Sequence, residues 1–167
     1  MKSNISTICD YATGRVAVES LTRDNYISTE NMLPKKLGIV KATSLPTVET
    51  TQAYRAGDVL VSNIRPYFKK IWFADRDGGC SNDVLVFRAQ KGVNSKYLYY
   101  VLSDDQFFAY SMATSKGTKM PRGDKTSIMQ YQVETWDIAI QDKIAAILES
   151  LNSKIAINRA INDNLAA

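Results

Sequence analysis

Histidine is absent from the 167 residues, and cysteine occurs only twice, at Cys9 and Cys80. The lack of histidine removes the usual general base of enzymes, the commonest zinc ligand, and every catalytic pair of serine or cysteine with histidine. The two cysteines lie far apart in the sequence and fit no metal-binding spacing, so we expect free thiols in a reducing compartment. Catalysis by carboxylates or lysines stays open, but no metal site is expected.

Long apolar runs are also lacking. No uninterrupted apolar stretch approaches the length of a membrane span, and Met1–Thr7 lacks the apolar core of a signal peptide. Hydrophobic residues make up 45% of the chain and charged residues 23%, as in soluble globular proteins. We therefore expect a cytoplasmic protein with no membrane partner, built as one domain of ordinary size with an appendage.

The formal net charge is only +4, so the distribution of charge is more informative than the total. The residues from Gln141 onward hold three bases and three acids, which leaves 18 bases against 14 acids in residues 1–140. Local basic clusters on a nearly balanced chain indicate a polyanionic partner, although a merely solvated surface would give the same pattern. The two clusters are Arg65, Lys69 and Lys70, and Lys116, Lys119, Arg122 and Lys125.

The middle of the chain predicts an antiparallel or mixed sheet. Residues 57–64 (GDVLVSNI), 70–74 (KIWFA) and 83–89 (DVLVFRA) have the β-branched and aromatic composition of strands. We interpret them as a meander, with turns at RPYFKK and DRDGGCSN. Residues 96–112 (KYLYYVLSDDQFFAYSM) change to three- and four-residue apolar steps, which predicts one amphipathic helix on that sheet. The fold class is therefore α+β, with short strands before residue 57 and an extended segment at 127–140.

Residues 141–165 contain neither proline nor glycine and carry a seven-residue apolar repeat, as coiled-coil helices do. Such a helix would be about 37 Å long, and a helix of this length with an exposed apolar stripe is only marginally stable alone in water. We expect a recognition domain of residues 1–138, followed by residues 139–167 as a helix that pairs with a second helix rather than folding back. The predicted pairing positions, with two asparagines that suit register control, are Ile144, Ile147, Leu148, Leu151, Ile155, Asn158, Ile161, Asn162 and Leu165.

Five stretches of the chain stand out in order: NYISTENMLP (25–34), GDVLVSNIRPYFKKIWFA (57–74), GGCSNDVLVFR (78–88), GTKMPR (117–122) and IAAILESLNSKIAINRAINDNL (144–165). Together they resemble the DNA-specificity subunit of type I restriction–modification systems. No single stretch is diagnostic, but they stand in the family's order and cover nearly the whole chain. The sequence is similar to one target recognition domain and one long helix, whereas the family subunit usually has two of each. The connector before the helix lacks the family's paired prolines, though Gln141 keeps its place.

The resemblance implies a non-catalytic protein that reads double-stranded DNA for partner subunits. In the family, modification subunits methylate adenine with S-adenosylmethionine, and restriction subunits use ATP and Mg²⁺, so no cofactor is expected in this chain. Each recognition domain reads one half of a bipartite site, and antiparallel helices set the distance between the halves. A second copy of this chain would therefore read an interrupted palindrome, whereas a different partner chain would give an asymmetric site.

The two basic clusters are the candidate DNA contacts. The loop TSKGTKMPRGDK (114–125) has glycines that permit close backbone approach, a proline that stiffens it, and bases that suit phosphates and guanine. The bend SNIRPYFKK (62–70) interleaves charge with aromatics, although we expect Phe68 in the core. Simple solvated connections are the alternative for both. The candidate DNA-binding residues are Arg65, Tyr67, Lys69, Lys70, Lys116, Thr118, Lys119, Arg122 and Lys125.

Two other classes of function remain open. NIRPYF (63–68) is superficially similar to the Asn-Pro-Pro-Tyr loop of adenine methyltransferases, but the residues between Asn63 and Pro66 differ and no glycine-rich cofactor loop follows a strand. An enzyme is therefore disfavoured. The main alternative is a protein-interaction module whose helix pairs with another chain and whose basic loops are only solvated. Such a module would show no DNA affinity for salt to weaken.

Overall fold

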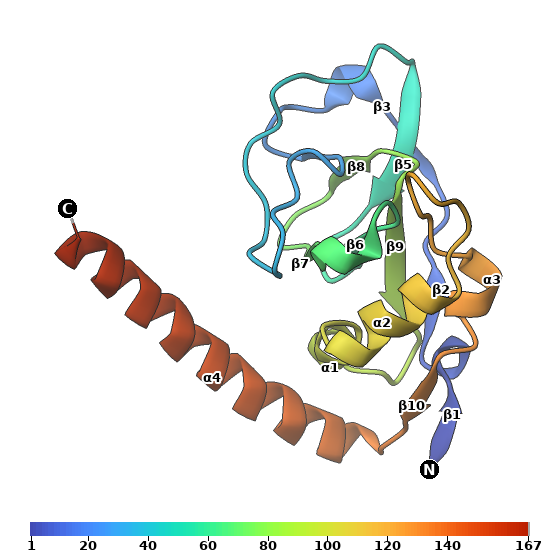
Figure 1. Cartoon of the computed structure of the whole chain (residues 1–167), viewed down its shortest axis with the longest axis vertical. Helices are drawn as coiled ribbons and strands as arrows, with labels where there is room; N and C mark the ends of the chain where they lie inside the picture. The colour runs from blue at the N-terminus through green and yellow to red at the C-terminus, as the bar shows by residue number, and fades with distance from the viewer. Residues whose placement is uncertain (167) are drawn as a thin grey trace.

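The computed structural model describes residues 1–166 as a mixed α+β domain from which one long helix projects, in agreement with the predicted fold class (Figure 1). Along the chain the elements are β1 (Lys2–Asn4), η1 (Ile5–Thr7), β2 (Cys9–Tyr11), β3 (Arg15–Ala17), η2 (Val18–Ser20), β4 (Tyr26–Ile27), β5 (Thr50–Tyr54), β6 (Val59–Ser62), η3 (Pro66–Phe68), β7 (Ile71–Phe73), β8 (Gly78–Cys80), β9 (Val84–Ala89), α1 (Ser95–Leu102), α2 (Asp105–Ala113), α3 (Lys125–Ile128), β10 (Gln132–Glu134) and α4 (Ile138–Leu165).

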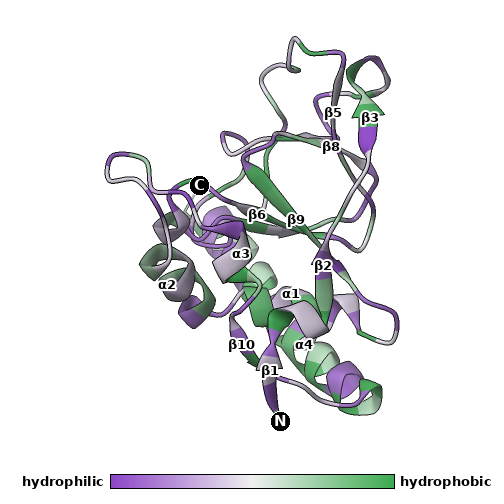
Figure 2. Ribbon diagram, turned by 90° about the vertical axis from the view of Figure 1, so that its right-hand side faces the viewer, coloured by the Kyte–Doolittle hydropathy of each residue, from purple (hydrophilic) through white to green (hydrophobic). Residues whose placement is uncertain are grey.

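The central sheet has the strand order β2-β9-β6-β7, and all its pairs are antiparallel. The three predicted strands are confirmed as β6, β7 and β9, but the meander is wrong, because β9 pairs with β6 and not with β7. The sequence of β6 explains its central place. Val59 and Val61 pack into the core beneath α1 and α2, while Leu60 packs into a second core on the opposite face. A strand that is buried on both faces belongs inside a sheet, and Figure 2 shows hydrophobic residues gathered along β6 and β9.

A second sheet has the strand order β3-β5-β8-β4. It explains why β7 and β9 are not paired, because the segment that joins them contributes a strand to this second sheet. The segment DRDGGCSN was expected to be only a turn, but it contains β8, which leaves the first sheet to pair with β5 and β4. Two glycines make this strand possible. A Cβ at Gly78 would lie 2.5 Å from the Tyr54 hydroxyl, and a Cβ at Gly79 would lie 2.6 Å from the Leu21 side chain. The glycine pair therefore marks a crowded strand.

The single helix predicted over residues 96–112 is two helices, α1 and α2. The break follows from capping, because the Asp104 side chain accepts a hydrogen bond from the Gln106 N–H (2.8 Å) and starts a new helix there. Of the positions on the apolar steps, Leu98, Leu102 and Phe108 are fully buried and Val101 is half-buried, whereas the fully buried Phe107 was missed.

Residues 127–140 are extended only in part. The chain passes through the end of α3 and then β10, which pairs with β1 near the N-terminus, before α4 begins at Ile138. The Asp137 side chain accepts from the Ile140 N–H (2.9 Å) and caps α4, which begins three residues before the predicted start at Gln141. The helix has 28 residues, which gives it a length of about 42 Å. Among residues 1–166 no helix is both long and apolar enough to cross a membrane.

Candidate nucleic-acid interface

The bend between β6 and β7 carries the first predicted basic cluster. The residues that flank the η3 turn, Arg65 and Lys69, both have left-handed backbones, with φ of 50° and 52°. The bend buries Pro66 but leaves 49% of Tyr67 and 39% of Phe68 exposed. The expectation that Phe68 lies in the core is therefore wrong, because the backbone conformation rather than hydrophobicity decides where the ring lies.

The second predicted cluster lies on a closed loop between α2 and α3. Lys116 and Arg122 exchange two backbone hydrogen bonds of 2.9 and 3.0 Å, so the residues between them protrude. Gly117, with a φ of 91°, adopts a backbone conformation there that side-chain-bearing residues rarely take. The other candidates on this segment, all exposed, are Thr118, Lys119 and Lys125.

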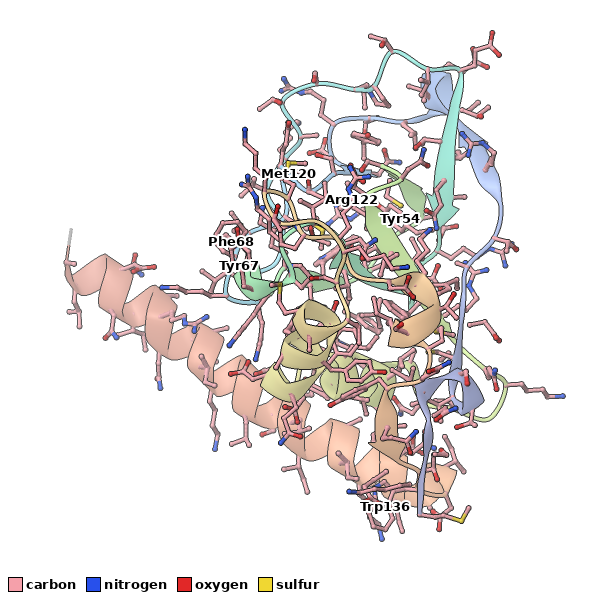
Figure 3. The ribbon with its side chains drawn as sticks, turned by 45° about the vertical axis from the view of Figure 1, so that its right-hand side comes forward. Tyr54, Tyr67, Phe68, Met120, Arg122 and Trp136 are labelled. Carbon is pink, nitrogen blue, oxygen red and sulfur yellow. The ribbon has the colours of Figure 1, made fainter. Side chains whose placement is uncertain are left out.

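These two basic segments lie side by side (Figure 3). The Arg65 N–H donates to the Pro121 carbonyl (2.8 Å), and the Gly123 N–H donates to the Asn63 carbonyl (3.2 Å). A Cβ at Gly123 would lie 2.8 Å from Oδ1 of Asn63, so this glycine serves packing between the segments rather than the expected approach to DNA. The structure thus joins two clusters that are far apart in the sequence into one surface.

Two buried polar atoms at this junction have no hydrogen-bond partner within residues 1–166: Oδ1 of Asn63 and Nε of Arg65. Unpartnered buried polar atoms are rare in native structures. Arg65 has both an unpartnered Nε atom and a left-handed backbone conformation. Backbone strain of this kind is found most often at functional sites. The junction between the segments is therefore a better candidate site than either segment alone.

Acidic residues hold several of the predicted cations in place. Arg122 pairs with Asp83 (3.1 Å), and the Lys116 ammonium donates to Asp124 (2.7 Å), which lowers the pKa of that carboxyl to about 2. Ion pairs as exposed as these contribute little to stability. These cations are therefore only weakly held by their carboxylate partners.

Lys70 differs from the other candidates because its ammonium points toward the domain. It donates to the Thr29 carbonyl (2.6 Å) and lies 5.7 Å from the centre of the Phe68 ring. Burial lowers the pKa of Lys70, partly countered by the charge of Glu30. Its position favours support of the bend over direct contact with a ligand.

A third basic segment was missed by sequence reasoning. Lys35 and Lys36 both have left-handed backbones, with φ of 57° and 61°, and their N–H groups donate to the carbonyls of Phe68 (2.8 Å) and Lys69 (2.9 Å). The side chains of Lys36 and Lys69 converge on the two carboxylate oxygens of Asp105, at 2.6 and 3.0 Å. The only signal in the sequence was the lysine pair within PKKLG (34–38), which by itself indicates no binding site.

The helix α4 presents two different faces. Gln141 and Ala145 are buried against the domain, and the predicted pairing residues Ile144 and Leu148 are half-buried, with Ile144 packed on the main core. At about 100° per residue, Ile147, Leu151 and Ile161 lie about 80–160° round the helix axis from Gln141, whereas Ile155 continues the domain-facing side, between the directions of Ile144 and Leu148. The exposed predicted positions are Ile147, Leu151, Ile155, Asn158, Ile161, Asn162 and Leu165.

A buried glutamine anchors the base of α4. Oε1 of Gln141 accepts from the Asn94 N–H (2.9 Å), and its Nε2 donates to the Trp136 carbonyl (2.7 Å). The Asn94 side chain in turn donates to Asp142 (2.6 Å) and caps α1. Because both partners of Gln141 are backbone groups, this side chain ties the connector, α1 and α4 together.

A second group of polar contacts lies farther along the helix. Glu149 accepts from the Tyr100 hydroxyl (2.7 Å) and pairs with Lys96 (3.2 Å), and Asn152 donates to the same hydroxyl (3.3 Å). The bond from Tyr100, followed by that from Lys96, holds the pKa of Glu149 below its usual value. Beyond this point the side chains of α4 are exposed.

Comparison with solved structures gives the same architecture. The HsdS subunit from Thermoanaerobacter tengcongensis matches with a TM-score of 0.73 at 20% identity, over 96% of this chain. A structure concerned with complex assembly and conformational transition of the type I R-M system gives 0.74 at 21% identity over 96%, and the S subunit of M. genitalium gives 0.59 at 18% over 98%. This chain spans 44% of the length of each of these structures.

No curated protein matches the sequence. The family described as the type I restriction modification DNA specificity domain matches residues 2–167, which is nearly the whole chain. The extent of this match and the shared fold both support the same family. The chain therefore belongs to the family of type I restriction–modification DNA specificity domains.

Proposed function

We propose that this chain reads double-stranded DNA as half of a specificity subunit, without catalysing a reaction itself. Its partner modification subunit would methylate adenine with S-adenosylmethionine, and a restriction subunit using ATP and Mg²⁺ would cleave unmodified DNA. The observation that carries the proposal is the joining of two basic segments into one surface, by the bond from Arg65 to Pro121, in a chain of this family.

Phosphate and base contacts have different sources in this proposal. Lys119 and Lys116, on the protruding loop, are suited to phosphates, which fix the position of the domain on the duplex. Arg122 lies at the closed end of that loop, and its guanidinium can form a bidentate pair with guanine. Arg65 is half-buried at the junction between the segments and is the second candidate for a base contact, whereas the unpartnered Asn63 oxygen is buried beneath it.

The exposed stripe of α4 supports pairing of two copies in antiparallel fashion. Pairing through Ile147, Leu151 and Ile161 would leave the domain-facing side of each helix undisturbed, because these three exposed side chains lie about 80–160° round the axis from the buried Gln141. The two recognition domains would then meet the same side of a duplex when their half-sites lie one helical turn apart, about 34–36 Å. Two identical domains related in this way would read an interrupted palindrome.

One observation favours a different function. Arg122, Lys116 and Lys69 already have acidic partners in this chain, as expected of a solvated surface in a module that only binds protein through α4. Salt separates the two proposals. Binding through six or more phosphates falls with salt at a log–log slope of about −5 or steeper, whereas a protein adaptor shows no DNA affinity to titrate.

The decisive experiment is co-expression of this chain with the type I modification subunit from the same genome, followed by mapping of methylated adenine. Methylation at an interrupted palindrome supports both DNA reading and the paired copies. Methylation at an asymmetric bipartite site keeps DNA reading but requires a different second half. No new methylation from an assembled complex would overturn the proposal and favour the interaction module.

A further inference from the structure

The basic surface contains an exposed aromatic pair whose role the charge pattern leaves open. The rings of Tyr67 and Phe68 lie 4.7 Å apart, centre to centre, and are tilted by 50°. Both are among the large hydrophobic residues that the fold leaves substantially exposed. They lie on the same side of the domain as Met120 and Arg122, away from Trp136 (Figure 3).

Backbone hydrogen bonds fix the turn that carries this pair. The Phe68 N–H donates to the Arg65 carbonyl (3.0 Å), and the Phe68 carbonyl accepts from the Lys35 N–H (2.8 Å). The two ends of the turn and the neighbouring loop together contain four left-handed non-glycine residues. Strain of this kind persists only where the surroundings fix it, and an exposed surface turn has no need of it for stability. The strain therefore points to a presented, preorganised feature.

Lysine side chains also connect the turn to the rest of the domain. Asp105, the first residue of α2, accepts from Lys36 (2.6 Å) and Lys69 (3.0 Å), and so links the α2 terminus to both left-handed turns. The Lys70 ammonium lies near the Phe68 ring, at 5.7 Å from its centre. Three lysines against one carboxylate leave a net positive charge beside the aromatic pair, which suits a polyanion that also offers flat apolar surfaces. DNA bases within a phosphate backbone meet both requirements.

We propose that Tyr67 and Phe68 act as a preorganised wedge that stacks on bases of the target DNA and partly unstacks one base step. The inference rests on the proposed function, because it takes the ligand to be DNA. Stacking of this kind is independent of base hydrogen bonding, so the wedge reads how easily the step deforms. Replacing either ring by alanine is expected to weaken binding by about 5- to 100-fold.

The test uses the assembled complex with the modification subunit and duplexes that carry its mapped target. 2-Aminopurine, which brightens when unstacked, replaces one base at a time, and the methylated adenine serves as an internal reference because its own extrusion also gives a signal. We expect a second bright position, separate from the methylated adenine. Phe68→Ala and Tyr67→Ala should abolish that second signal and retain the reference signal. Trp136→Ala is the matched control. It removes an aromatic side chain that is 43% exposed but lies far from the basic surface, and it should change neither signal.

The outcomes separate the wedge from the proposed function. Normal sequence-specific binding with no second bright position, or with one that survives both alanine substitutions, overturns the wedge alone. Loss of the modification subunit from the complex in both alanine variants would make the pair a protein-docking surface and also overturns it. If the wild-type complex binds no DNA sequence selectively, the proposed function fails, and the wedge fails with it.

Discussion

Gln141 offers a sharp test of how the recognition domain holds its helix. The Gln141→Ala substitution removes two hydrogen bonds, one from the Asn94 N–H (2.9 Å) and one to the Trp136 carbonyl (2.7 Å). Only 4% of the Gln141 surface is exposed, so a water molecule does not readily replace the two lost hydrogen bonds. Each unsatisfied backbone group costs about 1–3 kcal/mol when buried, and both groups here are only part-buried. We therefore expect a loss of about 2–4 kcal/mol in the free energy of unfolding.

The assay is urea unfolding followed by circular dichroism, at two protein concentrations so that any change in pairing is recognised. Gln141→Met keeps most of the side-chain volume but forms neither bond. An equal loss in both variants assigns the effect to hydrogen bonding, whereas recovery of stability by methionine assigns it to packing and contradicts our reasoning. Asn152→Ala, on the same face but exposed and with one bond of 3.3 Å, should stay within about 0.5 kcal/mol of wild type. A loss below about 0.5 kcal/mol for Gln141→Ala would refute the anchor.

Three further predictions concern other parts of the domain. Burial raises the pKa of both Cys9 and Cys80 to about 12, so a thiol reagent at neutral pH should modify neither in the folded protein and both in denaturant. The pKa of Glu149 is lowered on folding, so its contribution to stability is present above its unfolded value of about 4.3 and is lost as pH falls through the folded value. The difference in urea midpoint between wild type and Glu149→Gln should therefore be present at neutral pH and vanish in acid. Gly123→Ala should cost about 1–3 kcal/mol by thermal unfolding, because the added Cβ would crowd Asn63, whereas the exposed Thr118→Ala should change little.

The sequence predicted the elements whose pattern is local and failed where the deciding contact is distant. Alternation and β-branching located β6, β7 and β9, because those residues face two cores. The place of β8 in the second sheet was not predicted, because the crowding of Gly78 and Gly79 against Tyr54 and Leu21 is visible only in three dimensions. The break before α2 had a local signal in Asp104, but the apolar steps continue across it and concealed the cap.

The candidate surface was predictable in its parts and not in its assembly. Charge alone identified the bend and the loop, but their contact depends on the bond from Arg65 to Pro121, which no spacing indicates. Lys35 and Lys36 were missed because lysine seldom adopts a left-handed backbone, so nothing in the sequence placed them beside Phe68. That ring was assigned to the core on hydrophobicity, which the strained turn overrides. Contact of these residues with DNA stays a prediction.

The helix α4 departs from the usual rule of burial, because Gln141 is buried while several large apolar side chains remain 47–81% exposed. Five of these form the stripe: Ile147, Leu151, Ile155, Ile161 and Leu165. Burying the remaining half of each would contribute on the order of 1 kcal/mol per side chain, or about 10 kcal/mol for two copies. Association itself costs about 4–15 kcal/mol, so the stripe alone leaves pairing marginal. Pairing of isolated copies should therefore depend on concentration, and a duplex or a modification subunit that bridges both copies would supply what the stripe lacks.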